Sequence, residues 1–519
     1  MDKGLSSGAH GFDAGRGSAA VCAGLLILCV LGPGCLVAEA TSCENLAQVK
    51  LEKTEITTAQ SVPEGLLKVQ GFGPPKAVML PSFCRVAGRI HPSADSDIAF
   101  EVWLPVQWNG RFEAVGNGGL AGMIVTEAMA DALHNGYATA GTDTGHTGTV
   151  ASGDWALGHP EKVIDFGYRA VHEVTVRAKA LIAARYGSAT RYSYWYGCSE
   201  GGSQALSEAQ RYPDDYDGIV AGAPANSLVH LQAGGNWISQ AIHKDPETFL
   251  PPEKLPVITA AVLAQCDSAD GVKDGVLEDP RTCKFDPAVL KCKGEDSASC
   301  LTKAQIEGVK RVYDGARNPR TGGQVFPGYM QGGEAGWGIW IAGTAVPPQD
   351  LQHGISVAFF RNFVFDDAGW DWKTFDFDKD VTFADKKVGA TTDHINPDLS
   401  AWKRHGGKLL QYHGWNDPAI SPLNSVNYFE SVQKKMGDTG EFYRLFMVPG
   451  MEHCVGGPGP NQFDKMSAIV DWVEKGKAPD RIVASRLGRT RPLCPYPKVA
   501  KYTGSGSTDD AQNFVCMKP

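Results

Sequence analysis

The segment WYGCSEG, residues 195–201, places a serine between two glycines in the pattern G-x-S-x-G. In this pattern the small residues let the chain fold sharply, so that the serine hydroxyl projects from a strained turn and can attack a carbonyl carbon. The pattern alone is a weak signal, because it occurs by chance in many long chains. A tight turn in which Ser199 does no chemistry is the alternative interpretation.

A serine of ordinary acidity needs a general base, and the base needs a carboxylate that orients it. In proteins with this turn the order along the chain is serine, acid, histidine. Two downstream loops fit that order, GWNDP with Asp417 and GMEHC with His453. The rival His413 falls within an expected strand, and His146 precedes the serine, which favours a structural or pocket role. The sequence therefore predicts a triad of Ser199, Asp417 and His453.

Cysteines stand next to two of the three predicted triad residues. Cys198 precedes Ser199, and Cys454 follows His453. A disulfide between these cysteines would hold their Cα atoms within about 6 Å and so fix the nucleophile against the base. Two free buried thiols are the alternative, which an oxidising compartment disfavours.

The three predicted triad residues can meet only if the strands that precede them end at a common edge of a sheet. Apolar or aromatic segments that run into turns predict strands, and apolar residues at helical spacing predict the helices between them. The expected strands are 111–119, 137–143, 191–197, 217–224, 408–418 and 443–454, and the expected helices are 165–186, 201–213, 422–435 and 463–475. Between the expected strands 217–224 and 408–418, this alternation of strands and helices is absent for about 170 residues, in a stretch rich in Pro, Gly, Trp and Cys. This order predicts a parallel α/β sheet with a large insertion.

Length and composition agree with an enzyme of this class. The chain has 519 residues, so one large domain with an insertion and two separate domains are the leading options. Hydrophobic residues at 43% and charged residues at 21% are ordinary for a globular enzyme, and a net charge of -9 argues against nucleic-acid binding. We expect a small-molecule substrate, no nucleic-acid partner, no membrane association after signal cleavage and no organic cofactor. The oligomeric state stays open.

Residues 1–40 have the composition of an export signal. An apolar run from Ala19 is broken at Gly32–Pro33 and ends in Ala38-Glu39-Ala40, which has the form of a cleavage site. An uncleaved membrane anchor is the alternative. We expect cleavage after Ala40 and a secreted or periplasmic protein.

Export makes the cysteine count interpretable. The chain has 13 cysteines, and ten remain after removal of Cys22, Cys29 and Cys35 from the signal segment. An even number in an oxidising compartment predicts disulfides, although spacing alone does not fix the pairing. The pairs favoured by spacing, with the remaining pair last, are Cys266–Cys283, Cys292–Cys300, Cys494–Cys516, Cys43–Cys84 and Cys198–Cys454.

Essentially the whole chain after the signal resembles the tannase and feruloyl esterase family, which also includes mono(2-hydroxyethyl) terephthalate hydrolase. The most specific shared element is a triad bracketed by a disulfide, matched here by Cys198-Ser199, Asp417 and His453-Cys454. The resemblance implies an α/β-hydrolase core, an inserted lid domain and esters of phenolic acids as substrates. Members of the family differ in substrate, so the resemblance does not name one.

Acyl transfer also needs backbone N–H donors for the negatively charged oxygen of the intermediate. In this fold one donor follows the nucleophile, here Glu200, and the other lies in a glycine-rich loop after an early strand, here GNGGLAG. We expect Gly119 to be the second donor, with Gly118 next in order. A glycine turn without a ligand is the alternative.

In the segment CDSADGVKDGVLEDP, Asp267, Asp270 and Asp274 recur with glycines between them in a loop closed by Cys266 and Cys283. Carboxylates and carbonyl oxygens suit Ca²⁺, and the absence of histidine from the segment disfavours zinc. A solvated acidic turn is the alternative. The family resemblance implies a structural Ca²⁺ in the lid, with ligands from the side chains of Asp267, Asp270 and Asp274 and the carbonyls of Val272 and Val276.

The rest of the insertion is rich in aromatic residues that could wall a pocket for a phenolic ring, although most are expected in the lid's own core. These are Trp337, Trp340, Phe359, Phe360, Phe363 and Phe365. Arg361 could meet a substrate carboxylate, but a surface role is favoured. The expected division of the chain is a signal at 1–40, the first core part at 41–225, the lid with its calcium loop at 226–395 and the second core part at 396–519.

Together these features predict an exported serine esterase of the feruloyl esterase type that acts through an acyl-enzyme. Ser199 would attack the ester carbonyl, His453 would take its proton, and Asp417 would orient the imidazole. The amides of Glu200 and Gly119 would hold the oxyanion. Tannase (galloyl esterase) and mono(2-hydroxyethyl) terephthalate hydrolase activities stay open as alternatives. A non-catalytic aromatic-binding protein with the same fold is the alternative from another class.

Overall fold

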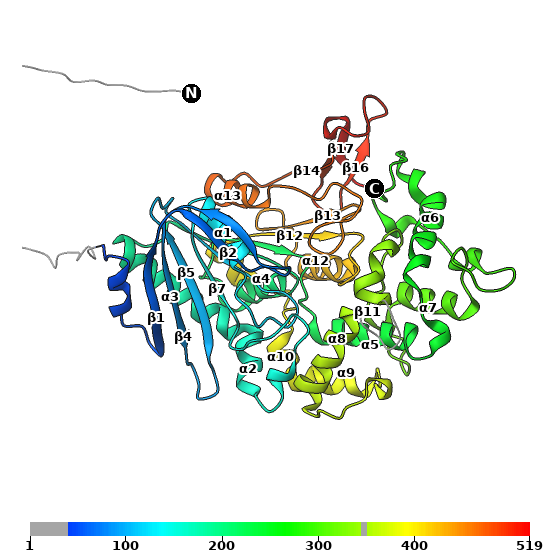
Figure 1. The fold of residues 1–519 in the computed structure, drawn as a ribbon. Coiled ribbons are helices and arrows are strands. Elements are labelled where there is room, and N and C mark those ends of the chain that lie inside the picture. Colours follow the sequence, from blue (N-terminus) through cyan, green and yellow to red (C-terminus); the bar gives the residue numbers. More distant parts are fainter. Residues whose placement is uncertain (1–39, 344–349) are drawn as a thin grey trace, which may run out of the picture. The chain divides into compact units, whose positions relative to one another are not determined.

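Nine strands form one mixed sheet in the computed structural model, which describes residues 40–343 and 350–519. In chain order they are β1 (Thr54–Val62), β4 (Phe83–Ile90), β5 (Ile98–Pro105), β6 (Arg111–Val115), β7 (Ala138–Thr142), β8 (Tyr192–Cys198), β9 (Gly218–Gly222), β12 (Lys408–Gly414) and β13 (Tyr443–Val448). Their order in the sheet is β1-β4-β5-β7-β6-β8-β9-β12-β13 (Figure 1). Neighbours from β1 to β7 pair antiparallel, and neighbours from β7 to β13 pair parallel.

Helices cover both faces of the parallel part of the sheet. Adjacent residues of each strand point to opposite faces, and apolar side chains on both faces are buried under helices. Trp195, Ile219 and Leu409 belong to the cluster on one face, whereas their neighbours Tyr194, Val220 and Leu410 belong to the cluster on the other. The first face packs against α3 (Ala170–Tyr186), α4 (Glu200–Arg211) and α12 (Pro422–Met436), and the second against α1 (Thr126–His134) and α13 (Lys465–Lys475).

The predicted α/β alternation is confirmed, with changes at the ends of elements. The helix expected over 165–186 begins earlier, because Pro160 occupies the first helical position of α2 (Pro160–Ile164), where its missing N–H costs nothing. A π-helical segment, Asp165–Arg169, joins α2 to α3. Gly187 in the left-handed conformation then ends α3 (φ 68°).

An insertion lies between β9 and β12, and in Figure 1 its helices, coloured green to yellow, gather away from β1 and β4 (blue). Its elements are α5 (Leu228–Ile242), α6 (Leu255–Cys266), α7 (Lys303–Asp314), β10 (Ala316–Arg317), β11 (Gln324–Phe326), α8 (Leu351–Ala358), α9 (Lys379–Ala384) and α10 (Ala390–Thr392), and α11 (Ser400–His405) leads back to the sheet. Ile258 and Val309 are part of an apolar cluster within the insertion, and Phe363 packs edge-on against Phe166 of the core. Of the aromatic residues expected in the lid core, four are buried: Trp337, Phe359, Phe360 and Phe363.

Small hairpins flank the sheet at both ends of the chain. They pair β2 (Gly65–Val69) with β3 (Lys76–Leu80), β14 (Ile482–Arg486) with β15 (Arg489–Leu493), and β16 (Val499–Tyr502) with β17 (Phe514–Met517). The predicted export signal, apart from Ala40, lies outside the described residues. Across residues 40–343 and 350–519, every helix is too short or too polar to cross a membrane.

Five disulfides occur in the pairing that the spacing favoured. Their Cα–Cα distances run from 5.0 to 6.0 Å, which is ordinary for this bond. The pairs are Cys43–Cys84, Cys198–Cys454, Cys266–Cys283, Cys292–Cys300 and Cys494–Cys516. Such a number of disulfides is typical of proteins from oxidising compartments.

Candidate active site

Ser199 occupies the turn between the end of β8 and the start of α4. Its backbone lies in a strained region (φ 65°, ψ -119°), as expected for a serine presented by a sharp strand-to-helix turn. The turn brings Gly197 and Gly201 together so closely that a Cβ on Gly197 would lie 2.4 Å from the carbonyl oxygen of Gly201. The glycine at 197 is therefore required by the close approach of the two backbone segments.

Asp417 and His453 lie in the loops that follow β12 and β13, and their side chains are in contact. His453 Nδ1 is 2.8 Å from Asp417 Oδ2. The other carboxylate oxygen of Asp417 accepts hydrogen bonds from the backbone N–H groups of Ala419 and Ile420, at 2.8 and 2.9 Å. Because Nδ1 of His453 is bound to the carboxylate, its Nε2 is the ring nitrogen available for Ser199.

The Asp417 carboxylate is fully buried but stays ionised. Burial alone would raise the pKa of Asp417, whereas the charge of His453 and hydrogen bonds from His413 and His453 hold that pKa well below its ordinary value. An ionised carboxylate orients the imidazole and stabilises the imidazolium that forms when His453 accepts a proton.

His413 contributes a second imidazole to this carboxylate. Its Nε2 is 3.1 Å from Asp417 Oδ2, and its Nδ1 is 2.7 Å from Ser425 Oγ. The ring is completely buried within β12, which agrees with the exclusion of His413 as the base. The sequence analysis did not predict the contact of His413 with Asp417. The two residues are four positions apart, one near the end of a strand and one in the loop that follows, and this short separation could have indicated the contact.

The disulfide between Cys198 and Cys454 brings the nucleophile loop and the base loop together. Its Cα atoms are 6.0 Å apart, and its cysteines are separated by 256 residues in sequence. In the sheet β9 and β12 stand between β8 and β13, so no ladder of backbone hydrogen bonds couples these two strands directly. The disulfide is thus a direct covalent tie between the residues next to Ser199 and His453.

The glycine-rich loop lies beside the start of α4, where the N–H of Gly201 donates to the carbonyl oxygen of Asn117 at 2.8 Å. Gly119 has a left-handed backbone (φ 57°), and a Cβ there would lie 2.2 Å from the carbonyl oxygen of Val150. Within the described parts of the chain, the N–H groups of Gly118, Gly119 and Glu200 have no hydrogen-bond acceptor. Free N–H groups on both sides of the serine are what an oxyanion site needs.

Asn117 and Gln204 fix this loop against the nucleophile helix. The side-chain amide of Asn117 donates to the carbonyl oxygens of Met123 and Thr142, at 2.7 and 2.8 Å. Gln204 accepts from the Asn117 N–H at 3.1 Å and donates to the Asn117 side-chain oxygen at 3.0 Å. Both residues were missed by the sequence reasoning, because their contact joins positions 87 residues apart.

His146 packs against the glycine-rich loop and bonds to its backbone. Its ring stacks on Trp155 with a centroid distance of 3.6 Å, and its Nε2 is 2.8 Å from the carbonyl oxygen of Leu120. Burial lowers the pKa of His146 to about 4, so the ring is neutral at neutral pH. These contacts agree with the structural role expected for His146.

The insertion reaches the triad through Trp340. The centroid of its ring lies 5.1 Å from that of His453, with the rings at 72° to each other. Tyr329 of the insertion also donates a hydrogen bond of 3.0 Å to the carbonyl oxygen of Ala419, in the loop of the acid. Arg361 instead pairs with Asp154 at 3.2 Å, where the Asp154 side chain is 82% exposed, which agrees with a surface role.

Residues 84–517 match the family model described as tannase and feruloyl esterase. The chain belongs to this family. An uncharacterized esterase of Xanthomonas campestris pv. campestris is 39% identical, over 92% of this chain and 91% of that protein. Mono(2-hydroxyethyl) terephthalate hydrolase of Piscinibacter sakaiensis is 34% identical, over 85% of this chain and 86% of that protein. The crystal structure of feruloyl esterase B from Aspergillus oryzae superposes with a TM-score of 0.85 at 31% identity, covering 92% of this chain and 100% of that chain.

Membership of the tannase and feruloyl esterase family confirms two of the predictions. The chain is a carboxylic ester hydrolase, and its sheet and helices form an α/β-hydrolase core with an insertion. The predicted esterase function is thereby confirmed at the level of the family, and its substrates are esters.

The acidic loop of this esterase lies between α6 and the C-terminal hairpins. A small cavity there is lined by Asp270, Val272, Asp274, Val276, Glu278 and Arg491, among others. Burial raises the pKa values of Asp270 and Asp274, and the charge of Asp267 raises both further, although Arg491 and Arg489 act against this for Asp274. Glu278 is partly buried, and its desolvation raises its pKa to about 8. Carboxylate and carbonyl oxygens are the ligands that a hard divalent cation such as Ca²⁺ prefers. In this structure Arg491 and Arg489 already pair with Asp274, and the side-chain oxygens of Asp267, Asp270 and Asp274 do not all lie within 4.8 Å of one another.

Proposed function

We propose that this esterase hydrolyses esters of aromatic, phenolic-type acids through an acyl-enzyme on Ser199. The observation that carries the proposal is the Asp417–His453 pair, tied by the Cys198–Cys454 disulfide to a serine in a strained turn. Nucleophile, base and acid then have the chain order and the loop positions that acyl transfer on this fold requires.

In the first half-reaction Ser199 Oγ attacks the ester carbonyl carbon while His453 Nε2 takes the hydroxyl proton. Asp417 keeps the proton on Nδ1 of His453 and stabilises the imidazolium. The N–H groups of Glu200 and Gly119 donate to the carbonyl oxygen as it becomes negative. The tetrahedral intermediate then collapses, the C–O bond to the alcohol breaks, and His453 returns the proton to the departing oxygen.

In the second half-reaction water takes the place of the alcohol. His453 accepts a proton from water, which attacks the acyl carbon, and the same N–H groups hold the oxyanion. Collapse breaks the bond to Ser199 Oγ, which regains its proton from His453, and the carboxylic acid leaves. Both half-reactions use only residues of the core.

Two features support the proposed substrate class, one in the insertion and one among the relatives. The Trp340 ring beside His453 offers a flat apolar surface to an aromatic acyl group. Two relatives are named for aromatic esters, feruloyl esterase B and mono(2-hydroxyethyl) terephthalate hydrolase. Feruloyl esters are the leading substrates in this proposal, with galloyl esters and the terephthalate half-ester as alternatives.

The proposal includes a structural Ca²⁺ and export from the cytoplasm. Ca²⁺ would be held by the carboxylates of Asp267, Asp270 and Asp274 and the carbonyls of Val272 and Val276, and it takes no part in the ester chemistry. Five disulfides and the export-like residues 1–40 support secretion or a periplasmic location.

A panel of esters tests the function. Turnover of p-nitrophenyl acetate and methyl ferulate is compared between the parent, Ser199→Ala and Ser203→Ala, a buried serine one turn further along α4. Only Ser199→Ala should lose activity, and equal turnover by that variant and the parent would overturn the serine mechanism. Methyl ferulate, methyl gallate, chlorogenate and mono(2-hydroxyethyl) terephthalate then rank the acids by kcat/KM.

A further inference from the structure

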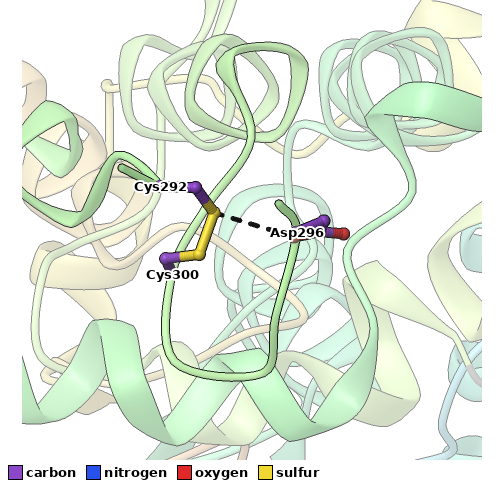
Figure 2. A group of neighbouring side chains, drawn as sticks. All are labelled: Cys292, Asp296 and Cys300. Carbon is purple, nitrogen blue, oxygen red and sulfur yellow. Dashed lines mark hydrogen bonds between the residues drawn. A yellow bond between two sulfur atoms is a disulfide. The ribbon is translucent and has the colours of Figure 1, made fainter. Parts of the chain in front are cut away.

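Two groups of His, Cys, Asp and Glu side chains are close enough to share a metal ion, among the residues that the structure describes. The first contains Cys292, Asp296 and Cys300, and Figure 2 shows its two sulfur atoms joined in a disulfide. Sulfurs in a disulfide are not thiolates, so they are not metal ligands in this state. Asp296 is also occupied, because it pairs with Lys254. This group therefore carries no site.

The second group joins two helices of the core and the loop between α4 and β9. His172 lies on α3, Glu208 on α4 and Asp215 in the loop, and one ligand atom of each lies within 4.8 Å of the others. His172 Nδ1 is 2.6 Å from Asp215 Oδ2. The imidazole stacks on Tyr212 with a centroid distance of 3.8 Å, which fixes the plane of the ring.

Glu208 is the unusual member of this group. Its side chain is completely buried, and neither carboxyl oxygen has a hydrogen-bond partner in the described part of the chain. A buried carboxyl group without donors is costly, so its retention calls for a partner. Glu208 also lies in the last turn of α4, where the helix dipole favours positive charge and not a carboxylate.

Lys179 places positive charge near Glu208 but makes no hydrogen bond to its carboxyl oxygens. Lys179 donates its hydrogen bond to the backbone oxygen of Asp215, and burial lowers the pKa of its ammonium group. The hydroxyl of Tyr216 is engaged by Thr175. Burial, then the charge of Asp215 and a side-chain contact with Asp215, raise the pKa of Glu208 well above its ordinary value. Without a cation the Glu208 carboxyl therefore keeps a proton, and the Asp215 carboxylate of the same group is the acceptor that faces it.

We propose that His172, Glu208 and Asp215 form a binding site for a divalent transition-metal ion of the Zn²⁺ type, with water as the fourth ligand. One imidazole and two carboxylates suit Zn²⁺, whereas Ca²⁺ prefers a larger set of oxygen ligands. The His172 side chain is 29% exposed, which gives an ion a path from solvent. Binding releases the proton of the Glu208 carboxyl.

Such an ion would brace the nucleophile helix at its far end. Glu208 follows Ser199 by nine residues, which is about 13 Å along a helix axis. The ion would tie α4 to α3 and to the loop before β9, and it would lie outside the ester-cleaving site. The site is thus independent of the proposed substrate class.

Metal binding by the full chain tests this site. The protein is stripped with a chelator and then kept in excess Ca²⁺, so that the acidic loop does not take up Zn²⁺. Zn²⁺ affinity is measured by calorimetry and bound zinc by elemental analysis for the parent, Glu208→Gln and His172→Gln. The control is Asp214→Asn, which alters an exposed His405–Asp214 pair of 3.1 Å that contains no buried carboxyl.

We expect the parent and Asp214→Asn to bind one equivalent of Zn²⁺ more than either ligand variant. Loss of a ligand should weaken this equivalent on the order of 100-fold or more, since even the loss of an outer contact weakens metal sites by about 10- to 100-fold. Zn²⁺ should also raise the melting temperature of the parent and the control only. Equal zinc binding by the parent and His172→Gln would overturn the site, and this variant decides the question if Glu208→Gln does not fold.

Discussion

The core loops that carry Ser199, Asp417 and His453 are held by different means from the insertion that packs against them. The core loops are fixed by a strained turn, by hydrogen bonds to buried side chains and by the Cys198–Cys454 disulfide. The insertion meets the base through one aromatic ring, Trp340, at 5.1 Å. The difference suggests that the core sets the rate of bond cleavage and the insertion sets which acid is accepted. Substitutions in the core loops should therefore mainly lower kcat, and substitutions in the insertion should mainly raise KM.

The largest effect is expected from the acid of the core. Asp417→Asn should lower kcat by about 10⁴-fold, because an amide does not hold His453 in the tautomer that accepts the serine proton. Steady-state kinetics on p-nitrophenyl acetate measure this loss, with the exposed Asp471→Asn on α13 as the control. A loss of less than tenfold would show that His453 does not depend on this carboxylate.

The second effect concerns the covalent tie within the core. A Cys198→Ala, Cys454→Ala double variant should stay folded through its four other disulfides, although loss of the disulfide costs about 2–4 kcal/mol. Its kcat should fall by about 100-fold, because 1 Å of misplacement between reacting groups has an effect of that size. The matched control is the Cys292→Ala, Cys300→Ala variant, which removes a disulfide of the insertion. Parental turnover in the folded double variant would show that the tie does not position the triad.

The insertion should give a smaller and more selective effect. Trp340→Ala should raise KM for methyl ferulate about tenfold at similar kcat, since an aromatic contact contributes about 0.5–1.5 kcal/mol. Hydrolysis of ethyl acetate should be unchanged. Ile339→Ala, at a neighbouring side chain that is 67% exposed, is the control. An equal loss on both esters would assign Trp340 to positioning of the base.

The smallest effect on turnover is expected at the acidic loop of the insertion. Asp270→Ala should lower the melting temperature in Ca²⁺ by a few degrees, because an ion at about 100 times its dissociation constant contributes about 2.7 kcal/mol. Initial turnover at 25 °C should stay near the parental value. Glu295→Ala, an exposed carboxylate in the same region, is the control. Lost turnover with unchanged melting would assign the loop to catalysis.

The same contrast governs what the sequence could predict. The parallel strands β8, β9, β12 and β13 were predictable because they are short apolar runs that end in turns, and the chemistry of the triad depends on local patterns at those ends. The antiparallel strands β1, β4 and β5 and the C-terminal hairpins gave no comparable pattern; β1 alternates between exposed and half-buried positions. The contacts of His413, Gln204 and Glu208 depend on which distant segments become neighbours, and this is decided by packing.

The Cys198–Cys454 disulfide also has a consequence for the integrity of the molecule. Its cysteines lie on either side of the whole insertion, so a protease that cuts between them leaves two fragments still joined by a covalent bond. The serine would stay on one fragment and the histidine on the other, at the two ends of the same link. A nicked molecule should therefore run as one species without reductant and as two with it. The two halves of the active site would in this way stay joined after a cut in the insertion.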